Sequence, residues 1–248
     1  MKIGIIGAGN IGAAVAQKLV VAGHDVKLAN SKGPESIRAL ARDLGAAAVS
    51  KEEAVTNVDV VVLSIPFAAY SSLTDLFRHV PADVTVIDTS NYYPFRDGSI
   101  PAVESTMPES AWVSAHIGRP VIKAWNAVLA YTLSEKGQSE GTAGRIAIPV
   151  AGDDEKGKTI AMQLVDATGF DAIDGGTLAQ SWRQQPGTPA YCSDLTAAEL
   201  PSALAAANQE RAAEYRDALI EEFMSGHGKL THETMVMRNR AVTAGQDA

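Results

Sequence analysis

The first two-thirds of the chain alternate between short apolar runs and segments in which apolar residues recur at helical spacing. Residues 2–6 and 25–29 are short runs rich in apolar side chains. Residues 59–64 and 83–88 are apolar almost throughout, as strands of a parallel sheet buried on both faces are. In residues 10–22, by contrast, apolar side chains recur every three or four positions, which predicts a helix.

The same alternation predicts the remaining elements. Strands are expected over residues 121–124, 145–150 and 171–174. Helices are expected over residues 34–44, 68–78, 125–133, 155–168, 197–224 and 232–242. Alternating strands and helices with a glycine-rich first turn are typical of the α/β class. We therefore predict a Rossmann-type, doubly wound and mostly parallel sheet with a small C-terminal helical region.

A G-x-G-x-x-G motif lies between the first predicted strand and the first predicted helix. Gly7 permits the tight turn, Gly9 lets a pyrophosphate approach the backbone, and Gly12 lets the helix pack closely on the strand. With Asn10 and Ile11, these residues open a helix whose free N–H groups attract phosphate. In this strand–turn–helix context the motif predicts a dinucleotide site.

The end of the second predicted strand indicates which dinucleotide binds. An NAD site has Asp or Glu there, to bond the ribose hydroxyls. This chain instead has Asn30, Ser31 and Lys32. A hydroxyl and an ammonium would hold a 2′-phosphate that a carboxylate would repel. We predict NADP(H), with Ser31 and Lys32 on the phosphate, Asn30 shaping the turn and Ser36 as a further donor. In the alternative interpretation, Lys32 is merely a solvated loop lysine.

Composition narrows the classes of partner. The 248 residues are 46% hydrophobic and 20% charged, with a net charge of −8, which argues against a nucleic-acid partner. Cys192 is the only cysteine, which fits a reducing cytoplasm and is expected to be a packed small side chain. His227 and His232 lie far from any Cys or carboxylate cluster, so no metal site is expected.

The ends and the apolar runs of the chain bear on its location. The N-terminal apolar run is too short and too rich in glycine for a signal-peptide core. No apolar run reaches the roughly 20 residues that a membrane span needs. A cytoplasmic protein without a membrane partner is expected.

Six segments of the sequence follow one another in a characteristic order and spacing: GAGNIG, NSK, LSIPF, PVIKAWNAV, VAGDD and GFDAIDGGTLAQSW. They resemble those of the family of NADP oxidoreductases that depend on the deazaflavin coenzyme F420. The NADPH-binding domain of the STEAP metalloreductases is similar. The resemblance extends from Met1 to about Tyr191.

The resemblance implies further site residues. It implies that a cofactor passes the ends of the following strands at Ser64, Ile65, Pro66, Thr89, Ser90 and Asn91. It also implies that Trp125 and Asn126 lie beside the nicotinamide, where the second substrate stacks. The methanogen-type enzymes tend to have histidine in place of Asn126, so this chain matches the STEAP-like pattern better.

Three functions follow as hypotheses. The first is hydride transfer between NADPH and a flavin-like or deazaflavin (F420) ring, which needs positioning more than an acid. The second is reduction of a small carbonyl or imine compound, which needs a proton donor. Its candidates are Lys123, His116, Tyr92 and Tyr93. The third is an NADP(H)-binding redox sensor without turnover.

Some of these candidates also have plainer interpretations. Lys123 with Asn126 resembles the Lys/Asn pair of β-hydroxyacid dehydrogenases, but the residues after Gly176 are too few for the long helical domain of those enzymes. Lys123 can equally end a strand and pair with an acid. His116 is expected in a loop, with a structural role.

The prediction for the whole chain has two parts. Residues 1–176 form an NADP-binding Rossmann-like domain, and residues 177–248 form a small, mainly helical region for substrate binding or dimerisation. The amphipathic helix near the C-terminus packs within the chain or, as the family implies, in a homodimer.

Overall fold

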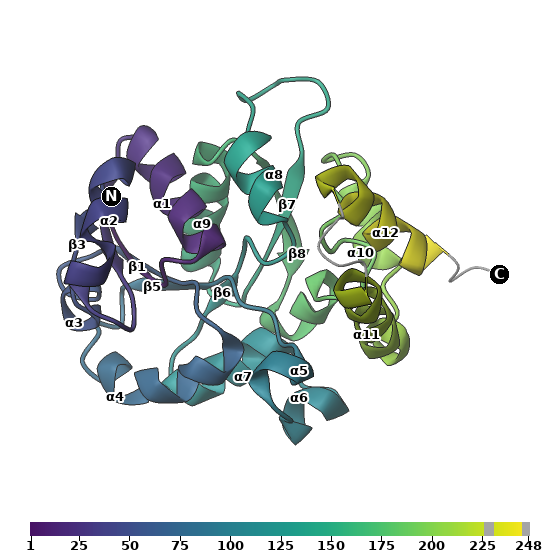
Figure 1. Ribbon diagram of the computed structural model, residues 1–248, viewed down its shortest axis with the longest axis horizontal. Helices are drawn as coiled ribbons and strands as arrows, with labels where there is room; N and C mark the ends of the chain where they lie inside the picture. Colours follow the sequence, from purple (N-terminus) through teal and green to yellow (C-terminus); the bar gives the residue numbers. More distant parts are fainter. Residues whose placement is uncertain (226–230, 245–248) are drawn as a thin grey trace.

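The computed structural model describes residues 1–225 and 231–244 and is built around one eight-stranded sheet (Figure 1). The strand order is β3-β2-β1-β4-β5-β6-β7-β8. Neighbouring strands are parallel except for β6 and β7, which are antiparallel. The strands are β1 (Lys2–Ile6), β2 (Asp25–Ala29), β3 (Ala47–Ala48), β4 (Val60–Leu63), β5 (Thr85–Asp88), β6 (Ile122–Lys123), β7 (Ala147–Ala151) and β8 (Asp171–Gly176).

Helices connect the strands and cover both faces of the sheet. The α-helices are α1 (Asn10–Val21), α2 (Arg38–Leu44), α3 (Lys51–Ala54), α4 (Thr74–Phe77), α5 (Pro94–Asp97), α6 (Pro101–Ser105), α7 (Glu109–Ile117), α8 (Ala130–Glu135), α9 (Glu155–Ala167), α10 (Leu200–Ala205), α11 (Gln209–Ser225) and α12 (His232–Ala244). The 3₁₀ helices are η1 (Pro34–Ile37), η2 (Phe67–Leu73) and η3 (Leu178–Gln184).

Alternate residues of the central strands feed two hydrophobic cores. In β4, Val60 and Val62 face the core under α1, α2, α8 and α9. Val61 and Leu63 face the core under α3, η2, α4 and α7. β4 is apolar throughout because both of its faces are covered. The predicted Rossmann-type fold is confirmed.

Several predicted helices begin or end elsewhere in the structure. The helix predicted from residue 125 begins only at Ala130. The helix predicted over residues 197–224 is two helices, because the side chain of Asn208 caps α11 by accepting from the N–H groups of Glu210 and Arg211. The predicted loop around His116 is wrong, because this residue lies on α7.

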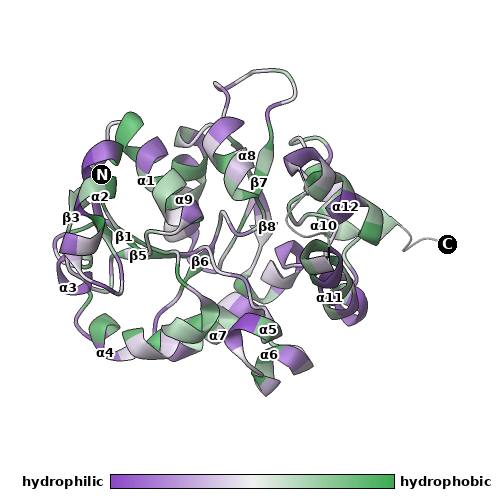
Figure 2. Ribbon diagram, in the orientation of Figure 1, coloured by the Kyte–Doolittle hydropathy of each residue, from purple (hydrophilic) through white to green (hydrophobic). Residues whose placement is uncertain are grey.

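The C-terminal helices form a layer beyond β8, separate from the helices on the two faces of the sheet (Figure 1). Tyr215 and Leu219 of α11 and Val236 of α12 are buried, whereas Met224 and Met237 are exposed. Figure 2 shows hydrophobic and hydrophilic residues on both α11 and α12. This division agrees with the predicted amphipathic character of the region. His227 and residues 245–248 lie outside the described residues.

Candidate functional site

The glycine turn joins β1 to α1 and is packed tightly at two of its three glycines. Gly7 has φ +119°, and a Cβ on it would lie 1.9 Å from the carbonyl oxygen of Ser64. A Cβ on Gly12 would lie 2.0 Å from the carbonyl oxygen of Gly7. Side chains at both positions are therefore excluded by the chain's own backbone.

Gly9 differs, because a Cβ there would have no heavy atom within 4 Å. Gly9 is exposed and forms the N-cap of α1, which has no side-chain cap and no acidic residue in its first turn. The N–H groups that open the helix, at Asn10, Ile11 and Gly12, have no intrahelical acceptor. The open position and the free donors fit a pyrophosphate, so the residues present match the dinucleotide that the motif predicts.

The turn after β2 is ordered around Asn30. The Oδ1 of Asn30 accepts from the backbone N–H of Lys32 at 3.0 Å, and its Nδ2 donates to the Oγ of Ser36 at 2.9 Å. Ser31 and Lys32 are exposed, and no ion pair of Lys32 occurs among the described residues. The nearest acid along the chain, Glu35, pairs with Arg38. The turn thus presents a hydroxyl and an uncompensated ammonium, as a 2′-phosphate requires.

The segment after β4 lies directly against the glycine turn. The Cβ of Ser64 is 3.2 Å from the position of a Cβ on Gly12, and Cγ2 of Ile65 is 3.3 Å from that of a Cβ on Gly7. Ser64 and Ile65 are partly exposed and Pro66 is exposed. The sheet order places these residues at the switch point between β1 and β4, where doubly wound sheets bind ligands.

At the ends of β5 and β6, by contrast, the chain forms a buried polar network. Lys123 is fully buried, and its Nζ donates to Glu109 Oε2 at 3.2 Å, to Ser110 Oγ at 3.1 Å and to the backbone oxygen of Ser90 at 3.1 Å. Burial raises the pKa of the Glu109 carboxyl, and the charge of Lys123 opposes that shift. All three N–H groups of the ammonium are used, so Lys123 is not open to a substrate. The structure agrees with the alternative interpretation of Lys123, in which it ends a strand and pairs with an acid, here Glu109.

Asp88 extends this network beneath the loop after β5. Its Oδ1 accepts from the hydroxyl of Tyr70 at 2.5 Å and from the N–H of Ser90 at 2.9 Å, and its Oδ2 accepts from Ser110 at 2.6 Å. The first residues after β5 are thus held by buried side chains from η2, α7 and β6. Thr89 and Ser90 are buried, which leaves Asn91 as the partly exposed member of the predicted triplet.

Trp125 does not form the predicted wall of the site. Its backbone has φ +56°, its side chain is fully buried in the core beneath α1 and α9, and its Nε1 donates to Thr168 Oγ1 at 3.2 Å. A ring with no exposed face cannot stack on a second substrate. The KAWN motif predicted a pocket residue here, but the left-handed backbone directs the indole into the core.

Asn126 is also buried, but it lies next to the predicted cofactor residue Asn91. Its Nδ2 donates to Asn91 Oδ1 at 3.0 Å and to the backbone oxygen of Gln184 at 2.7 Å. Its backbone oxygen in turn accepts from Asn91 Nδ2 at 2.9 Å. Asn126 therefore joins the loop after β5 to η3, and it reaches the predicted cofactor residues through Asn91.

The other candidate proton donors lie in different surroundings. The ring of His116 stacks on Trp112, with 3.5 Å between ring centroids. The hydroxyl of Tyr92 donates to Glu104 at 2.6 Å, and burial, followed by this carboxylate, raises the pKa of Tyr92 to about 12. Tyr93 differs, since its hydroxyl lies 2.6 Å from that of Tyr191, which Asn91 also contacts. Of these, Tyr93 lies beside a predicted cofactor residue.

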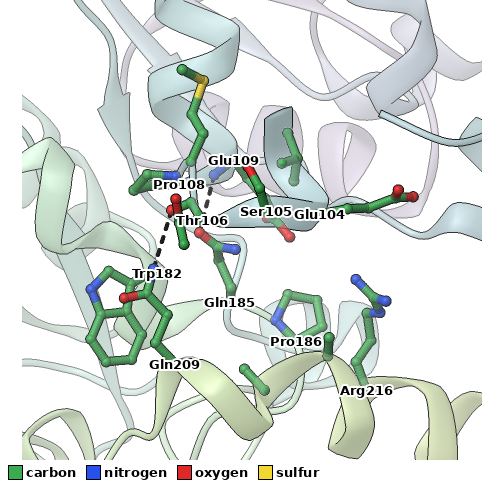
Figure 3. A pocket seen from close by; sticks show the side chains of 14 residues that line it. Glu104, Ser105, Thr106, Pro108, Glu109, Trp182, Gln185, Pro186, Gln209 and Arg216 are labelled. Atoms are coloured by element: carbon green, nitrogen blue, oxygen red, sulfur yellow. Dashed lines mark hydrogen bonds between the residues drawn. The ribbon is translucent and has the colours of Figure 1, made fainter. Parts of the chain in front are cut away.

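A small cleft lined by Glu109, Gln185 and Gln209 opens beside the start of α7 (Figure 3). The N–H of Glu109 donates to Gln185 Oε1 at 3.1 Å, and Gln209 Nε2 donates to the carbonyl of Thr106 at 3.2 Å, so hydrogen bonds cross it. Its volume is about 140 Å³. Small-molecule pockets have volumes of about 300–1,000 Å³, so this cleft is too small for a flavin-like ring.

The described residues also bear on metals, the thiol and membranes. In residues 1–225 and 231–244, no group of three or more His, Cys, Asp or Glu side chains is arranged to hold a metal ion. Cys192 is buried, and burial raises the pKa of its thiol, as for a packed small side chain. Within the same ranges, no helix has the length and apolar character to cross a membrane.

Fold and site together define the class: a Rossmann-type dinucleotide-binding protein whose turn after β2 lacks the carboxylate of NAD sites. The family model of NADP oxidoreductases, coenzyme F420-dependent, matches residues 2–92. The protein YjhV of Escherichia coli (strain K12) is 40% identical over 107 residues, which are 42% of this chain and 75% of YjhV.

Two further proteins extend the similarity along the chain. Metalloreductase STEAP3 of Rattus norvegicus is 28% identical over 180 residues, which are 73% of this chain but only 35% of that protein. The structure of SMa0349 from Sinorhizobium meliloti superimposes with a TM-score of 0.68 at 28% identity and covers 79% of this chain and 95% of its own. The chain belongs to the family of coenzyme F420-dependent NADP oxidoreductases and is an NADP-dependent oxidoreductase.

Tyr191, Gln184 and Glu109 are residues of this region that the motifs did not indicate. Glu109 lies in a segment without a motif, and Gln184 follows the segment GFDAIDGGTLAQSW by two residues. Tyr191 lies 98 residues beyond Tyr93 along the chain. Nothing in the local sequence pairs them, because the loop that follows η3 brings them together only in the folded chain.

Proposed function

We propose that this protein transfers a hydride between NADPH and a flavin-like or deazaflavin ring. The observation that carries the proposal is the turn after β2, where Ser31 and Lys32 are exposed and Lys32 has no ion-pair partner within residues 1–225 and 231–244. In this proposal Gly9 and the first N–H groups of α1 bind the pyrophosphate. NADPH, when bound, supplies the hydride.

The proposed cofactor path follows the order of the strands. From the phosphate at the end of β2, an extended dinucleotide crosses the end of β1 and passes Ser64, Ile65 and Pro66 after β4. Asn91, after β5, then lies at the nicotinamide end. The work left to the protein is to hold two rings together in a site from which water is excluded.

The test of the cofactor compares NADPH and NADH binding in the wild type and in Lys32→Ala. We expect the wild type to prefer NADPH and the variant to lose about ten- to hundredfold in NADPH affinity, since a charge-assisted contact to phosphate contributes roughly 1.5–3 kcal/mol. NADH affinity should not change. Lys51→Ala, which removes a different lysine, is the matched control. Equal affinities of the wild type for both nucleotides would overturn the NADP assignment.

The test of the acceptor follows nicotinamide absorbance when FMN, FAD or the deazaflavin is mixed with NADPH-loaded protein. Oxidation of NADPH by one of these rings supports the proposal. Oxidation only by small carbonyl or imine compounds favours the second hypothesis, against which the burial of Lys123 already counts. No oxidation by either class, with NADPH bound, favours a redox sensor.

The proposal also assigns residues 177–248 to substrate binding and dimerisation in the cytoplasm. Met224 on α11 and Met237 on α12 are 68% and 60% exposed, which supports a homodimer through these helices. Light scattering gives the mass directly: a monomer at all concentrations would overturn the dimer.

A further inference from the structure

Two tyrosines from distant parts of the chain meet at the end of β5. Tyr93 follows β5 directly, and Tyr191 belongs to the loop after η3. Their hydroxyl oxygens are 2.6 Å apart, and both residues remain partly exposed. Strand order places this pair at the nicotinamide end of the proposed cofactor path, next to Asn91.

Backbone carbonyls set the direction of the amide hydrogen bonds beside the pair. Asn126 must point its Nδ2 at the carbonyl of Gln184, and Asn91 must point its Nδ2 at the carbonyl of Asn126. That same Nδ2 of Asn91 lies 3.4 Å from the Tyr191 oxygen, which therefore accepts. Either tyrosine can donate in the bond between the two hydroxyls. When Tyr191 donates to Tyr93, the proton of Tyr93 is left for another acceptor.

The loop that carries Tyr93 is held in place by the chain. Its backbone N–H donates to Asp97 Oδ2 at 3.0 Å, and Arg96 Nη2 donates to the carbonyl of Asn91 at 2.7 Å. Beside it, Phe95 is 62% exposed, with its ring centroid 5.8 Å from that of Tyr93. A tyrosine on a fixed loop beside an exposed aromatic side chain suits a planar acceptor ring.

We infer that Tyr93 is the catalytic proton donor to the hydride acceptor, with Tyr191 as the positioning residue that orients and reloads it; this rests on the proposed function. A hydride passes with its electron pair from the nicotinamide to the electrophilic atom of the acceptor, so the nicotinamide is oxidised and the acceptor reduced. The O–H bond of Tyr93 breaks, and its proton goes to the acceptor's ring nitrogen. Tyr93 then takes a proton from Tyr191, which takes one from the solvent after the reduced acceptor has left.

The protonation states of the two hydroxyls agree with this role. Burial raises the pKa of both Tyr93 and Tyr191 above the usual value of tyrosine, so both are protonated near neutral pH. The hydrogen bond from Tyr191 opposes that shift at Tyr93, because it stabilises the phenolate left after proton transfer.

The experiment compares Tyr93→Phe, Tyr191→Phe and the control Tyr131→Phe, whose ring is on α8 and exposed. With the acceptor found above, we expect Tyr93→Phe to slow NADPH oxidation about a hundredfold or more at neutral pH, with NADPH affinity unchanged. Tyr191→Phe should slow it about tenfold, and Tyr131→Phe should not. The wild-type rate should be constant across neutral pH, whereas the Tyr93→Phe rate should follow the proton concentration.

A second readout needs no turnover. In an alkaline titration followed by tyrosinate absorbance, Tyr191→Phe should move the ionisation of Tyr93 to higher pH, because the phenolate loses its donor. The double variant identifies which signal belongs to Tyr93.

The outcomes separate the two proposals. If no flavin-like or deazaflavin ring is reduced by NADPH on the wild type, the proposed function fails. If one of them is reduced and Tyr93→Phe is equally fast, or if the ionisation of Tyr93 does not move, only the role of Tyr93 is overturned.

Discussion

At the ends of β1 and β2 the chain leaves backbone N–H groups and exposed side chains open, whereas at the ends of β5 and β6 it fills the same edge with buried side chains. The first region is made by glycines and one ordered turn around Asn30. The second is made by the ion pair of Lys123 with Glu109 and by the amides of Asn91 and Asn126.

In the proposed function, the difference follows from what each region holds. A dinucleotide has the same phosphates in every enzyme, so backbone donors at a helix start are sufficient. A hydride acceptor must instead be placed against one ring to within a fraction of an ångström, which requires side chains that cannot move. Substitutions at the ends of β5 and β6 should therefore lower the stability of the fold, whereas substitutions at the ends of β1 and β2 should lower nucleotide affinity.

The largest effect is expected from Glu109→Ala, because it leaves the Lys123 ammonium fully buried without its ion-pair partner. We expect a loss of about 3–5 kcal/mol in the free energy of unfolding, measured by urea denaturation. Glu109→Gln, which keeps an oxygen for Lys123, should lose less. A loss in Glu109→Ala as small as that of the exposed control Glu210→Ala would contradict the importance of this pair.

An intermediate effect is expected from a pair of glycine substitutions in one turn. Gly12→Ala forces a Cβ to within 2.0 Å of a backbone oxygen, which should cost about 1–3 kcal/mol of stability. Gly9→Ala meets no atom, so it should cost about 1 kcal/mol or less, from the weaker N-cap. Its main effect should be on NADPH affinity, measured by calorimetric titration. Unchanged affinity in Gly9→Ala would contradict the pyrophosphate site.

The smallest effect is expected at alkaline pH and concerns Tyr92. Since its pKa is raised to about 12 in the folded protein, its contribution to stability is complete below the unfolded value of about 10 and is lost as the pH rises through about 12. Tyr92→Phe should lack this part of the alkaline loss. The measurement is urea denaturation of both proteins across that range, and identical pH profiles would contradict it.

Much of the fold was readable from the sequence. The strand of residues 2–6 has the same ends in the structure, as does that of residues 25–29, since short apolar runs between turns allow little else. The helices between β5 and β6 could not be predicted from the sequence. These helices, α5, α6 and α7, lack a long apolar repeat and are fixed by contacts such as that of Ser110 with Asp88.

For the site, the sequence by itself determined the local features of the proposed nucleotide end, because the glycine spacing and the residues after β2 act through local backbone geometry. Only the tertiary structure decided the other end. Trp125 and Lys123 have the residue types of a reactive site, yet packing and ion pairing bury both. The pairing of Tyr93 with Tyr191 depends on a contact between residues far apart in the chain, which local spacing does not encode.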